Sequence, residues 1–252
     1  MDDPNQLDRA QLKYVKQEMT RFMMSYKFAV DQITTKVDIL KQEFQYIHDY
    51  NPIEQINSRV KSPESIFKKA KRKGIELSLD SIKEHITDIA GVRISCSFIS
   101  DIYRLRDMIE GQKDIDVIDS KDYIEYPKPN GYQSLHLILT VPVFMSDREE
   151  KVYVEVQIRT IAMDFWASLE HKIYYKYEYE IPKRLLDDLK EAAESAAELD
   201  RKMEALHKEI GDLKRDYDDD EEDLKNMLIS KDNFKIPMDL LLSMVNPDES
   251  NE

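Results

Sequence analysis

The stretch KVYVEVQIRT, residues 151–160, decides which fold the sequence predicts. Apolar and polar residues alternate along it, and a period of two is typical of a β-strand with one buried face. The apolar face consists of Val152, Val154, Val156 and Ile158. The other face carries Tyr153, Glu155, Gln157 and Arg159. Many antiparallel strands have one solvated face, so this strand alone predicts a sheet and leaves the role of its polar face open.

The segment before this strand has the same alternation. YQSLHLILTVPV, residues 132–143, follows the turn PKPNG and is expected to be the neighbouring strand. One of its faces carries Leu135, Leu137 and Leu139. The other carries Tyr132, Ser134 and His136. If the two polar faces lie on one side of the sheet, they form a binding surface. The plainer alternative is a core tyrosine beside a hydrogen-bonded histidine.

Two further strands and several helices surround this pair. The strands are expected in IAGVRISCSF, residues 89–98, and IDVIDSKDYI, residues 115–124, with a helix from about Asp101 between them. Cys96 lies in the first of these runs and is expected to be a core residue. Strands flanked by helices predict one α/β or α+β domain.

Helical periodicity marks both ends of the chain. Apolar positions three and four apart make the first fifty residues helical, Asn51-Pro52 stops the run, and a short helix is expected next. Residues 63–73 are expected to form a helix that Ser62 caps and Gly74 ends. Helix resumes at Ile161 and continues, after a break at Pro182, to about residue 228. The predicted organisation is a helical extension (1–50), a central domain (51–180), C-terminal helices (181–228) and a tail of unassigned role (229–252).

Composition limits the function. The net charge of −14 argues against broad nucleic-acid binding, because neutralising phosphates needs a positive surface. One cysteine excludes a disulfide framework within the chain and a multi-cysteine metal site. No stretch approaches the ~18 apolar residues of a membrane span, and we expect a soluble, cytoplasmic protein. The basic segment 59–73 on this acidic chain favours a compact anionic ligand.

The basic segment has the residue types of a phosphate site. Ser65, Lys69 and Arg72 are spaced by four and three and share a helical face, with Arg59 and Lys61 just before it. A solvated basic face is the alternative. Asp88, in the turn before a strand, and Glu155 are two carboxylates that could hold Mg²⁺ together with substrate phosphates. From spacing alone the chain is predicted to be a Mg²⁺-dependent nucleotide enzyme.

Four motifs in order give a more specific result. DIAGVRI, KDYI…PKPNGYQSLH, VEVQIRT and WASLEHKIYYKY, within about residues 57–178, resemble the synthetase domain of the RelA/SpoT family. The chain is most similar in plan to its small, single-domain alarmone synthetases. The resemblance implies transfer of the β,γ-diphosphate of ATP to the 3′-hydroxyl of GDP or GTP, giving AMP and (p)ppGpp. It also implies a nucleotidyltransferase-like mixed sheet flanked by helices, a homotetramer, and no hydrolase domain ahead of the synthetase region.

The resemblance also assigns roles to residues. ATP binding falls to Arg59 and Arg93, which would sandwich adenine, and to Lys61, Ser65, Lys69 and Arg72, which would hold its phosphates. Acceptor binding falls to Lys121, Lys128, Tyr132, His136 and Gln157. Tyr132 would stack on guanine through its ring, and glycine at 131 would let the backbone approach the ligand. Asp88 and Glu155 would bind Mg²⁺, and Glu155 would take the proton of the 3′-hydroxyl.

Three rival functions stay open at this point. They are a toxic relative that modifies the 3′ end of tRNA, an inactive nucleotide sensor, and a helical interaction protein built on the apolar seam of 183–228. The negative charge weighs against the first, and the retained carboxylates weigh against the second. Residues 34–41, TTKVDILK, are a poor match to the basic segment through which some small synthetases bind (p)ppGpp, so activation by the product is left open. The preference for GDP or GTP as the acceptor is also left open.

Overall fold

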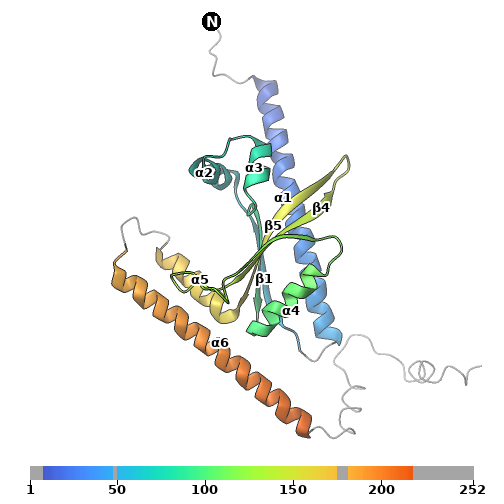
Figure 1. Cartoon of the computed structure of the whole chain (residues 1–252). Helices are drawn as coiled ribbons and strands as arrows, with labels where there is room; N and C mark the ends of the chain where they lie inside the picture. The colour runs from blue at the N-terminus through green and yellow to red at the C-terminus, as the bar shows by residue number, and fades with distance from the viewer. Residues whose placement is uncertain (1–7, 48–49, 175–180, 218–252) are drawn as a thin grey trace, which may run out of the picture. The chain divides into compact units, whose positions relative to one another are not determined.

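The computed structural model describes residues 8–47, 50–174 and 181–217 (Figure 1). The strands are β1 (Ile53–Val60), β2 (Ala90–Cys96), β3 (Asp116–Asp122), β4 (Leu135–Phe144) and β5 (Glu149–Thr160). The helices are α1 (Arg9–Ile47), α2 (Pro63–Lys73), α3 (Leu79–His85), α4 (Ile99–Glu110), α5 (Ile161–Tyr174) and α6 (Lys183–Tyr217). Residues up to Leu206 form one compact unit, and a second begins at His207 within α6. The expected tail 229–252 lies outside the described residues.

The five strands form one mixed sheet in the order β1-β2-β5-β4-β3. β5 lies at its centre, parallel to β2 and antiparallel to β4. This arrangement confirms the predicted mixed α/β fold. Because β5 has a neighbour on each side, the side chains on its polar face meet those of both β2 and β4.

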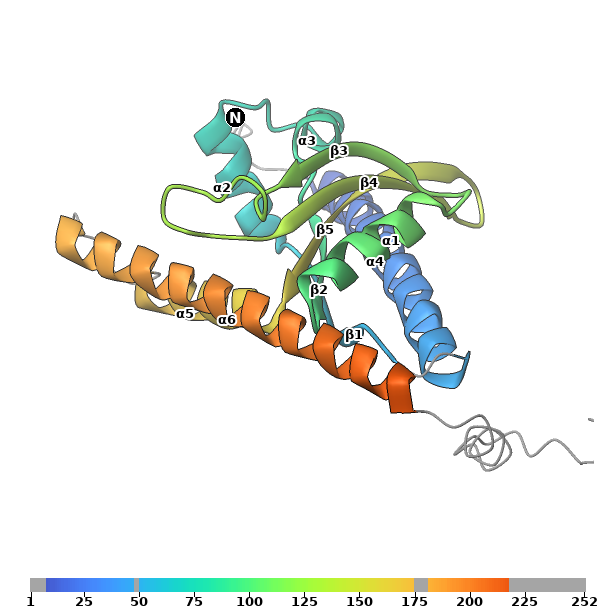
Figure 2. The ribbon, with the colours of Figure 1, turned by 60° about the horizontal axis from the view of Figure 1, so that its bottom comes forward.

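The core lies on the apolar face of the sheet, as the alternation predicts. The valines and the isoleucine of β5 are at most 4% exposed, and Leu135, Leu137 and Leu139 of β4 are at most 1% exposed. α1 and α4 bury apolar residues in the same cluster. Cys96 is fully buried there, which confirms its predicted place. In Figure 2 α1 and α4 lie along the sheet, while α5 follows the end of β5 on its other side.

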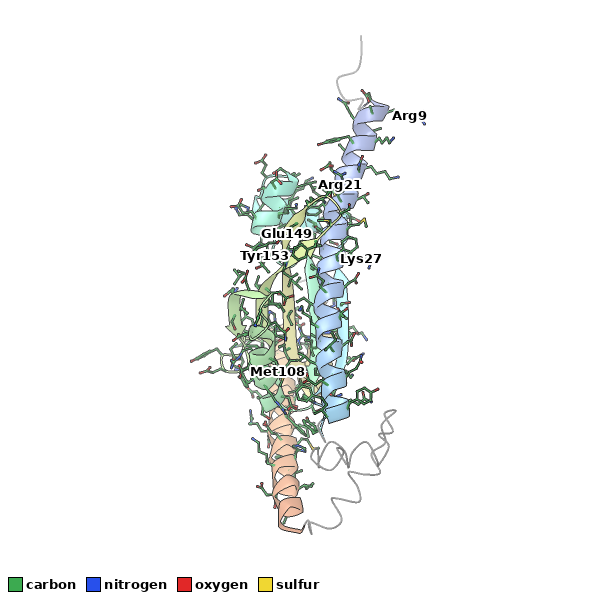
Figure 3. The ribbon with its side chains drawn as sticks, turned by 90° about the vertical axis from the view of Figure 1, so that its right-hand side faces the viewer. Arg9, Arg21, Lys27, Met108, Glu149 and Tyr153 are labelled. Atoms are coloured by element: carbon green, nitrogen blue, oxygen red, sulfur yellow. The ribbon has the colours of Figure 1, made fainter. Side chains whose placement is uncertain are left out.

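α1 runs the length of the sheet. Figure 3 shows Arg21 and Lys27 of α1 beside the Glu149–Tyr153 end of β5. The residues of α1 that face the sheet are spaced by three and four, as expected of a helix with one buried side, and they include Phe22, Tyr26, Ala29, Ile33 and Val37. Among the described residues, no helix has the length and apolar character needed to cross a membrane.

Two local expectations about the region 51–85 have different outcomes. The expected short helix after Pro52 is wrong, because residues 53–60 form β1, an edge strand antiparallel to β2. Its sequence IEQINSRV is too polar to show the alternation of a strand, and backbone pairing with β2 stabilises the strand instead. Helix α2 is confirmed: the Ser62 side chain accepts from the Ser65 N–H, and Gly74 ends the helix at φ 67°. The sequence did not predict α3.

The turn before β4 packs against α6. Gly131 has φ +87°, and a Cβ atom there would lie 2.5 Å from the Cβ of Ala193. The expectation that Gly131 lets the backbone approach a ligand stays a prediction, and the close contact with α6 is a second reason for a glycine at this position. Trp166 of α5 donates to the carbonyl of Leu189 at 3.1 Å and is buried beside Ala193. The turn that carries Tyr132 therefore packs against α6.

We predict that Gly131→Ala destabilises the protein. A left-handed conformation costs a residue with a Cβ about 1–2 kcal/mol, and the contact with Ala193 adds overpacking of about 1–3 kcal/mol. Differential scanning calorimetry should show a melting temperature lower by roughly 4–20 °C. The control is Gly211→Ala in α6, where a Cβ meets nothing within 4 Å. An unchanged melting temperature for Gly131→Ala would contradict the packing of the turn on α6.

Candidate active site

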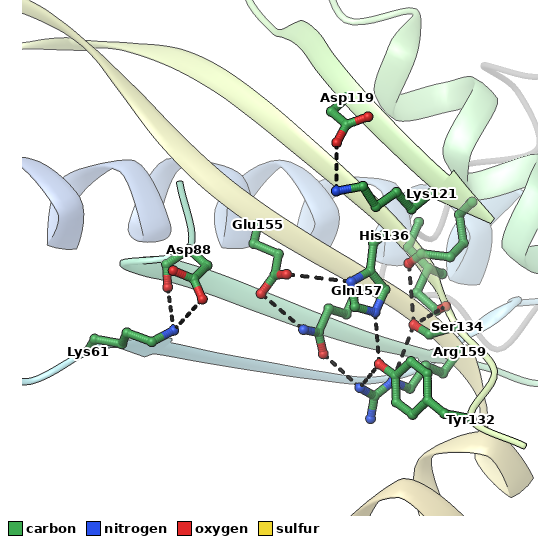
Figure 4. A network of polar contacts seen from close by, with 12 residues as sticks. Lys61, Asp88, Asp119, Lys121, Tyr132, Ser134, His136, Glu155, Gln157 and Arg159 are labelled. Atoms are coloured by element: carbon green, nitrogen blue, oxygen red, sulfur yellow. Dashed lines mark hydrogen bonds and ion pairs between the residues drawn. The ribbon is translucent and has the colours of Figure 1, made fainter. Parts of the chain in front are cut away.

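One row of polar side chains crosses all five strands on the face opposite the core. The register pairs Asn57 with Arg93, Arg93 with Gln157, Gln157 with His136, and His136 with Lys121. Paired residues point to the same side of a sheet. The polar faces of β4 and β5 therefore do lie on one side, as the binding-surface interpretation requires (Figure 4).

Asp88 lies in the turn before β2 and is held by two lysines. Lys61 donates to its carboxylate at 2.9 Å and to its backbone carbonyl at 2.6 Å, and Lys69 of α2 pairs with the same carboxylate oxygen. Burial raises the pKa of Asp88, but the hydrogen bonds from Lys69 and Lys61 outweigh it and leave the pKa below its usual range. Asp88 is therefore a carboxylate at neutral pH, and α2 is tied to the sheet through it.

Glu155 stands on β5 in the next row. Gln157 donates to one carboxylate oxygen at 3.0 Å, and His136 Nδ1 lies 3.5 Å from the other. Burial raises the pKa of Glu155, as does the charge of Asp88, while His136 and Gln157 lower it and prevail. Figure 4 shows Glu155 and Asp88 on the same side of the sheet.

Arg159 donates hydrogen bonds that fix the side chains around Glu155. One of its terminal nitrogens, Nη2, donates to the Tyr132 hydroxyl at 2.6 Å and to Gln157 Oε1 at 2.7 Å. Because arginine only donates, the Tyr132 hydrogen is left for His136 Nε2, 2.8 Å away. His136 Nδ1 then carries its hydrogen toward Glu155. Two chains of hydrogen bonds, one through Tyr132 and His136 and one through Gln157, run from the guanidinium to the carboxylate.

Asp164, in the first turn of α5, links Arg159 to the other side of the site. Its carboxylate accepts from Arg159 Nη1 at 3.1 Å and lies 3.3 Å from Arg93 Nε. Arg93 is thereby fixed on the sheet face. Arg59, on β1, is exposed and diagonal to it. Both arginines line a cavity of about 600 Å³ that also includes Gly91, Tyr132 and Glu155.

The other predicted phosphate ligands lie on α2. Ser65 is in its first turn, where its hydroxyl accepts from Ser62 at 2.9 Å. Arg72 is exposed in the last turn. Of the α2 residues, Lys69 is the one the structure ties directly to a site carboxylate. The cations of α2, Lys61 and Asp88 thus form one side of the site, while His136 and Tyr132 form the other.

The predicted acceptor ligands lie on that second side. Lys121 follows His136 in the row and pairs with Asp119 at 3.0 Å. The Lys128 ammonium sits 4.6 Å from the centre of the Tyr132 ring and 4.5 Å from that of Tyr123. Tyr132 precedes β4, which begins only at Leu135, so its place is set by the turn rather than by strand alternation. Ser134, expected on the same face, is fully buried and binds the β5 backbone.

The two carboxylates suit a divalent cation that arrives with phosphates. Asp88 Oδ1 is buried without a hydrogen-bond partner in the described part of the chain, while its other oxygen takes both lysines. No group of three or more histidine, cysteine or acidic side chains converges anywhere in residues 8–47, 50–174 and 181–217. Mg²⁺ usually takes one or two carboxylates plus substrate phosphates, so this donor set fits that ion.

Comparison with known proteins agrees with this geometry. Residues 58–180 match the family described as a region found in RelA / SpoT proteins. The GTP pyrophosphokinase YwaC of Bacillus subtilis (strain 168) is 55% identical over 199 residues, which cover 79% of this chain and 95% of YwaC. The chain belongs to the RelA/SpoT family.

Solved structures of small alarmone synthetases from this family have the same fold. Small alarmone synthetase 1 from Bacillus subtilis bound to its product pppGpp superposes with a TM-score of 0.71 at 39% identity, covering 77% of this chain and 98% of that one. The same synthetase bound to AMPCPP gives a TM-score of 0.66 at 36% identity, with the same coverage. In this chain the RelA/SpoT region contains the polar row from Arg93 to Lys121, and Asn57 immediately precedes the region.

The sequence pattern of this RelA/SpoT chain did not identify Arg159 and Asp164 as organising residues. Arg159 was recognised only as part of a polar face. The signal was present, since an arginine one residue before the end of a central strand is buried on both sides and needs an acid nearby. Asp164 follows five residues later, at the start of a helix, where that acid can fold back onto the strand.

We predict that Tyr132→Phe destabilises the protein although it keeps the ring. The change leaves His136 Nε2 and an Arg159 N–H without their partner, which costs about 1–3 kcal/mol for buried groups. Thermal unfolding should show a melting temperature lower by roughly 2–12 °C. The control is Tyr126→Phe in the same loop, whose tyrosine is 72% exposed, with no change beyond about 0.5 kcal/mol. Equal stability of the two variants would show that the Tyr132 hydroxyl does not hold the network.

Proposed function

We propose that the chain is a (p)ppGpp synthetase, a GTP pyrophosphokinase that transfers the β,γ-diphosphate of ATP to the 3′-hydroxyl of GDP or GTP. The observation that carries the proposal is that Glu155 lines one cavity together with Arg59, Arg93 and Tyr132. Asp88, held by Lys61 and Lys69, lies on the same side of the sheet (Figure 4). Membership of the RelA/SpoT family, and the nucleotides bound to its small synthetases, support the same reaction.

ATP belongs on the side of β1, β2 and α2. Lys61 and Lys69 lie beside Asp88, and Ser65 and Arg72 extend the polar surface along α2, so this side can hold a chain of phosphates. The guanidinium groups of Arg59 and Arg93 stack well on flat aromatic rings and would hold the adenine. Nucleotide phosphates would compete with Asp88 for the two lysines and so free its carboxylate.

The guanosine nucleotide belongs on the side of Tyr132. A guanine that stacks on the ring face covered by Lys128 displaces that ammonium, whose charge is then available to the 5′-phosphates. Lys121, His136 and Gln157 supply further polar groups in the same row. The acceptor's 3′-hydroxyl would then reach Glu155, which stands between the two sides.

The proposed chemistry follows from this placement. Glu155 takes the proton from the 3′-hydroxyl, the 3′-oxygen forms a bond to the β-phosphorus of ATP, and the bond from that phosphorus to the oxygen of AMP breaks. The lowered pKa of Glu155 keeps it ionised at neutral pH but makes it a modest base. Alignment of the two nucleotides and the lysine charges beside the phosphates therefore supply much of the rate.

Mg²⁺ is the proposed cofactor. Asp88 and Glu155 would hold it, and when bound it neutralises charge on the transferred phosphates. Its requirement for ionised carboxylates is met, because the pKa of each of the two residues is lowered. Lys61 and Lys69 keep Asp88 in that state in the protein alone.

We also propose that the protein acts as a homo-oligomer, a homotetramer by resemblance to its family, and works in the cytoplasm beside its nucleotide substrates. Exposed apolar residues on α5 support an interface with another copy. They recur every four residues and are Ile161, Phe165, Leu169 and Ile173.

The test is a product assay with ATP labelled at the γ-phosphate. Purified protein and Mg²⁺ are incubated with GDP, GTP or deacylated tRNA, and the products are separated by thin-layer chromatography. We predict that label appears in ppGpp or pppGpp with stoichiometric AMP, that the tRNA stays unlabelled, and that EDTA stops the reaction. Label on tRNA, or no labelled guanosine product with either nucleotide, would overturn the proposed function.

A further inference from the structure

The donor side of the cavity contains a side-chain amide that the reaction described above does not use. Asn57 lies on β1, lines the cavity and is half-buried. Among the described residues, no group forms a hydrogen bond with its side chain. An amide offers one acceptor and two donors, whereas the neighbouring arginines only donate.

The strand register places this amide relative to the two arginines. Arg59 pairs with Gly91 and Asn57 pairs with Arg93. Residues two apart on a strand share a face, so the four positions form a square on the polar face of the sheet. The arginines occupy one diagonal of the square, while Asn57 and Gly91 occupy the other.

A flat ring held between the two guanidinium groups lies along the second diagonal. Gly91 has no side chain, and the Arg59 side chain lies against it, since a Cβ built at Gly91 would be 3.8 Å from Arg59 Cγ. Gly91 also pairs with Glu155 on β5, so the ribose and phosphates leave the ring on the Gly91 side. The opposite edge of the ring then faces Asn57.

We propose that Asn57 is a specificity-determining residue that hydrogen-bonds the edge of the adenine carrying the 6-amino group of ATP. The inference rests on the proposed function for the placement of ATP. Amide side chains recognise adenine through a paired contact, in which the oxygen accepts from N6 and the nitrogen donates to a ring nitrogen. Arginine stacking alone holds any purine, and Asn57 adds the contact that depends on the group at C6.

The test compares ATP with purine riboside triphosphate, which lacks the 6-amino group, as donors at saturating GDP. We expect the wild-type protein to favour ATP in kcat/KM by roughly tenfold, the size of one lost hydrogen bond in a polar site. Asn57→Ala should bring the ratio close to one, mainly by raising the KM for ATP. Asn57→Asp keeps an accepting oxygen for N6, so its ratio should stay within about twofold of wild type.

The matched control is Gln55→Ala. Gln55 has the same amide group on the same strand and face, but it pairs with Ser95, one step farther from Gly91. Its ratio should equal that of wild type.

Two results would overturn the inference in a protein that transfers the diphosphate from ATP to GDP. One is that Asn57→Ala keeps the wild-type preference for ATP over purine riboside triphosphate, and the other is that Gln55→Ala loses this preference instead. Absence of any transfer by the wild-type protein is a different result, which overturns the proposed function and this inference with it. Where Asn57→Ala is poorly folded, Asn57→Val takes its place, because valine suits a strand and has no polar group, and it should lose the preference in the same way.

Discussion

Arg159 carries a guanidinium that is almost wholly buried, at 5% exposure, and a buried charge needs hydrogen-bond partners on every side. Its partners are Tyr132, Ser134, Gln157 and Asp164. Each of these side chains is fixed because it satisfies the same cation. Gln157 donates to Glu155 directly, and Tyr132 is linked to it through His136. Glu155, at the centre of the proposed reaction, is therefore oriented by the charge of Arg159, which contacts neither nucleotide in our assignment. Leaving such a charge without a partner costs about 3–5 kcal/mol, which makes the network hard to change one residue at a time.

This arrangement follows from how β5 ends. Arg159 is the last residue but one of the strand, and α5 begins at Ile161, so Asp164 returns to the sheet within one helical turn. The same aspartate contacts Arg93 on β2. The donor side and the acceptor side of the cavity therefore share one rigid support. α6 completes it by packing beneath the turn at Gly131 that presents Tyr132.

Patterns of period two and of helix capping were sufficient to predict much of this from the sequence. The alternation in β5 and β4 predicted the buried face and left a shared polar face as one of two alternatives, and the Ser62 and Gly74 caps predicted α2. β1 was not predictable, because an edge strand as polar as IEQINSRV becomes a strand only through its partner. The contact between Gly131 and Ala193, sixty-two residues apart, also depends on tertiary packing that no local pattern encodes. The pairing of Asp88 with Lys61 and Lys69 has the same origin, although the residues themselves were candidates from the start.

The central claim is that Glu155 takes the proton of the acceptor between two bound nucleotides. The most direct measurement is the turnover of Glu155→Gln, together with calorimetric binding of AMPCPP and GDP to it. Glutamine keeps the shape and can still accept from one of His136 and Gln157, but it removes the base and one carboxylate for the metal. We predict a loss of kcat of about 10²–10⁴-fold with both nucleotides still bound. Turnover close to that of the wild type, or a loss explained entirely by weaker nucleotide binding, would contradict this account.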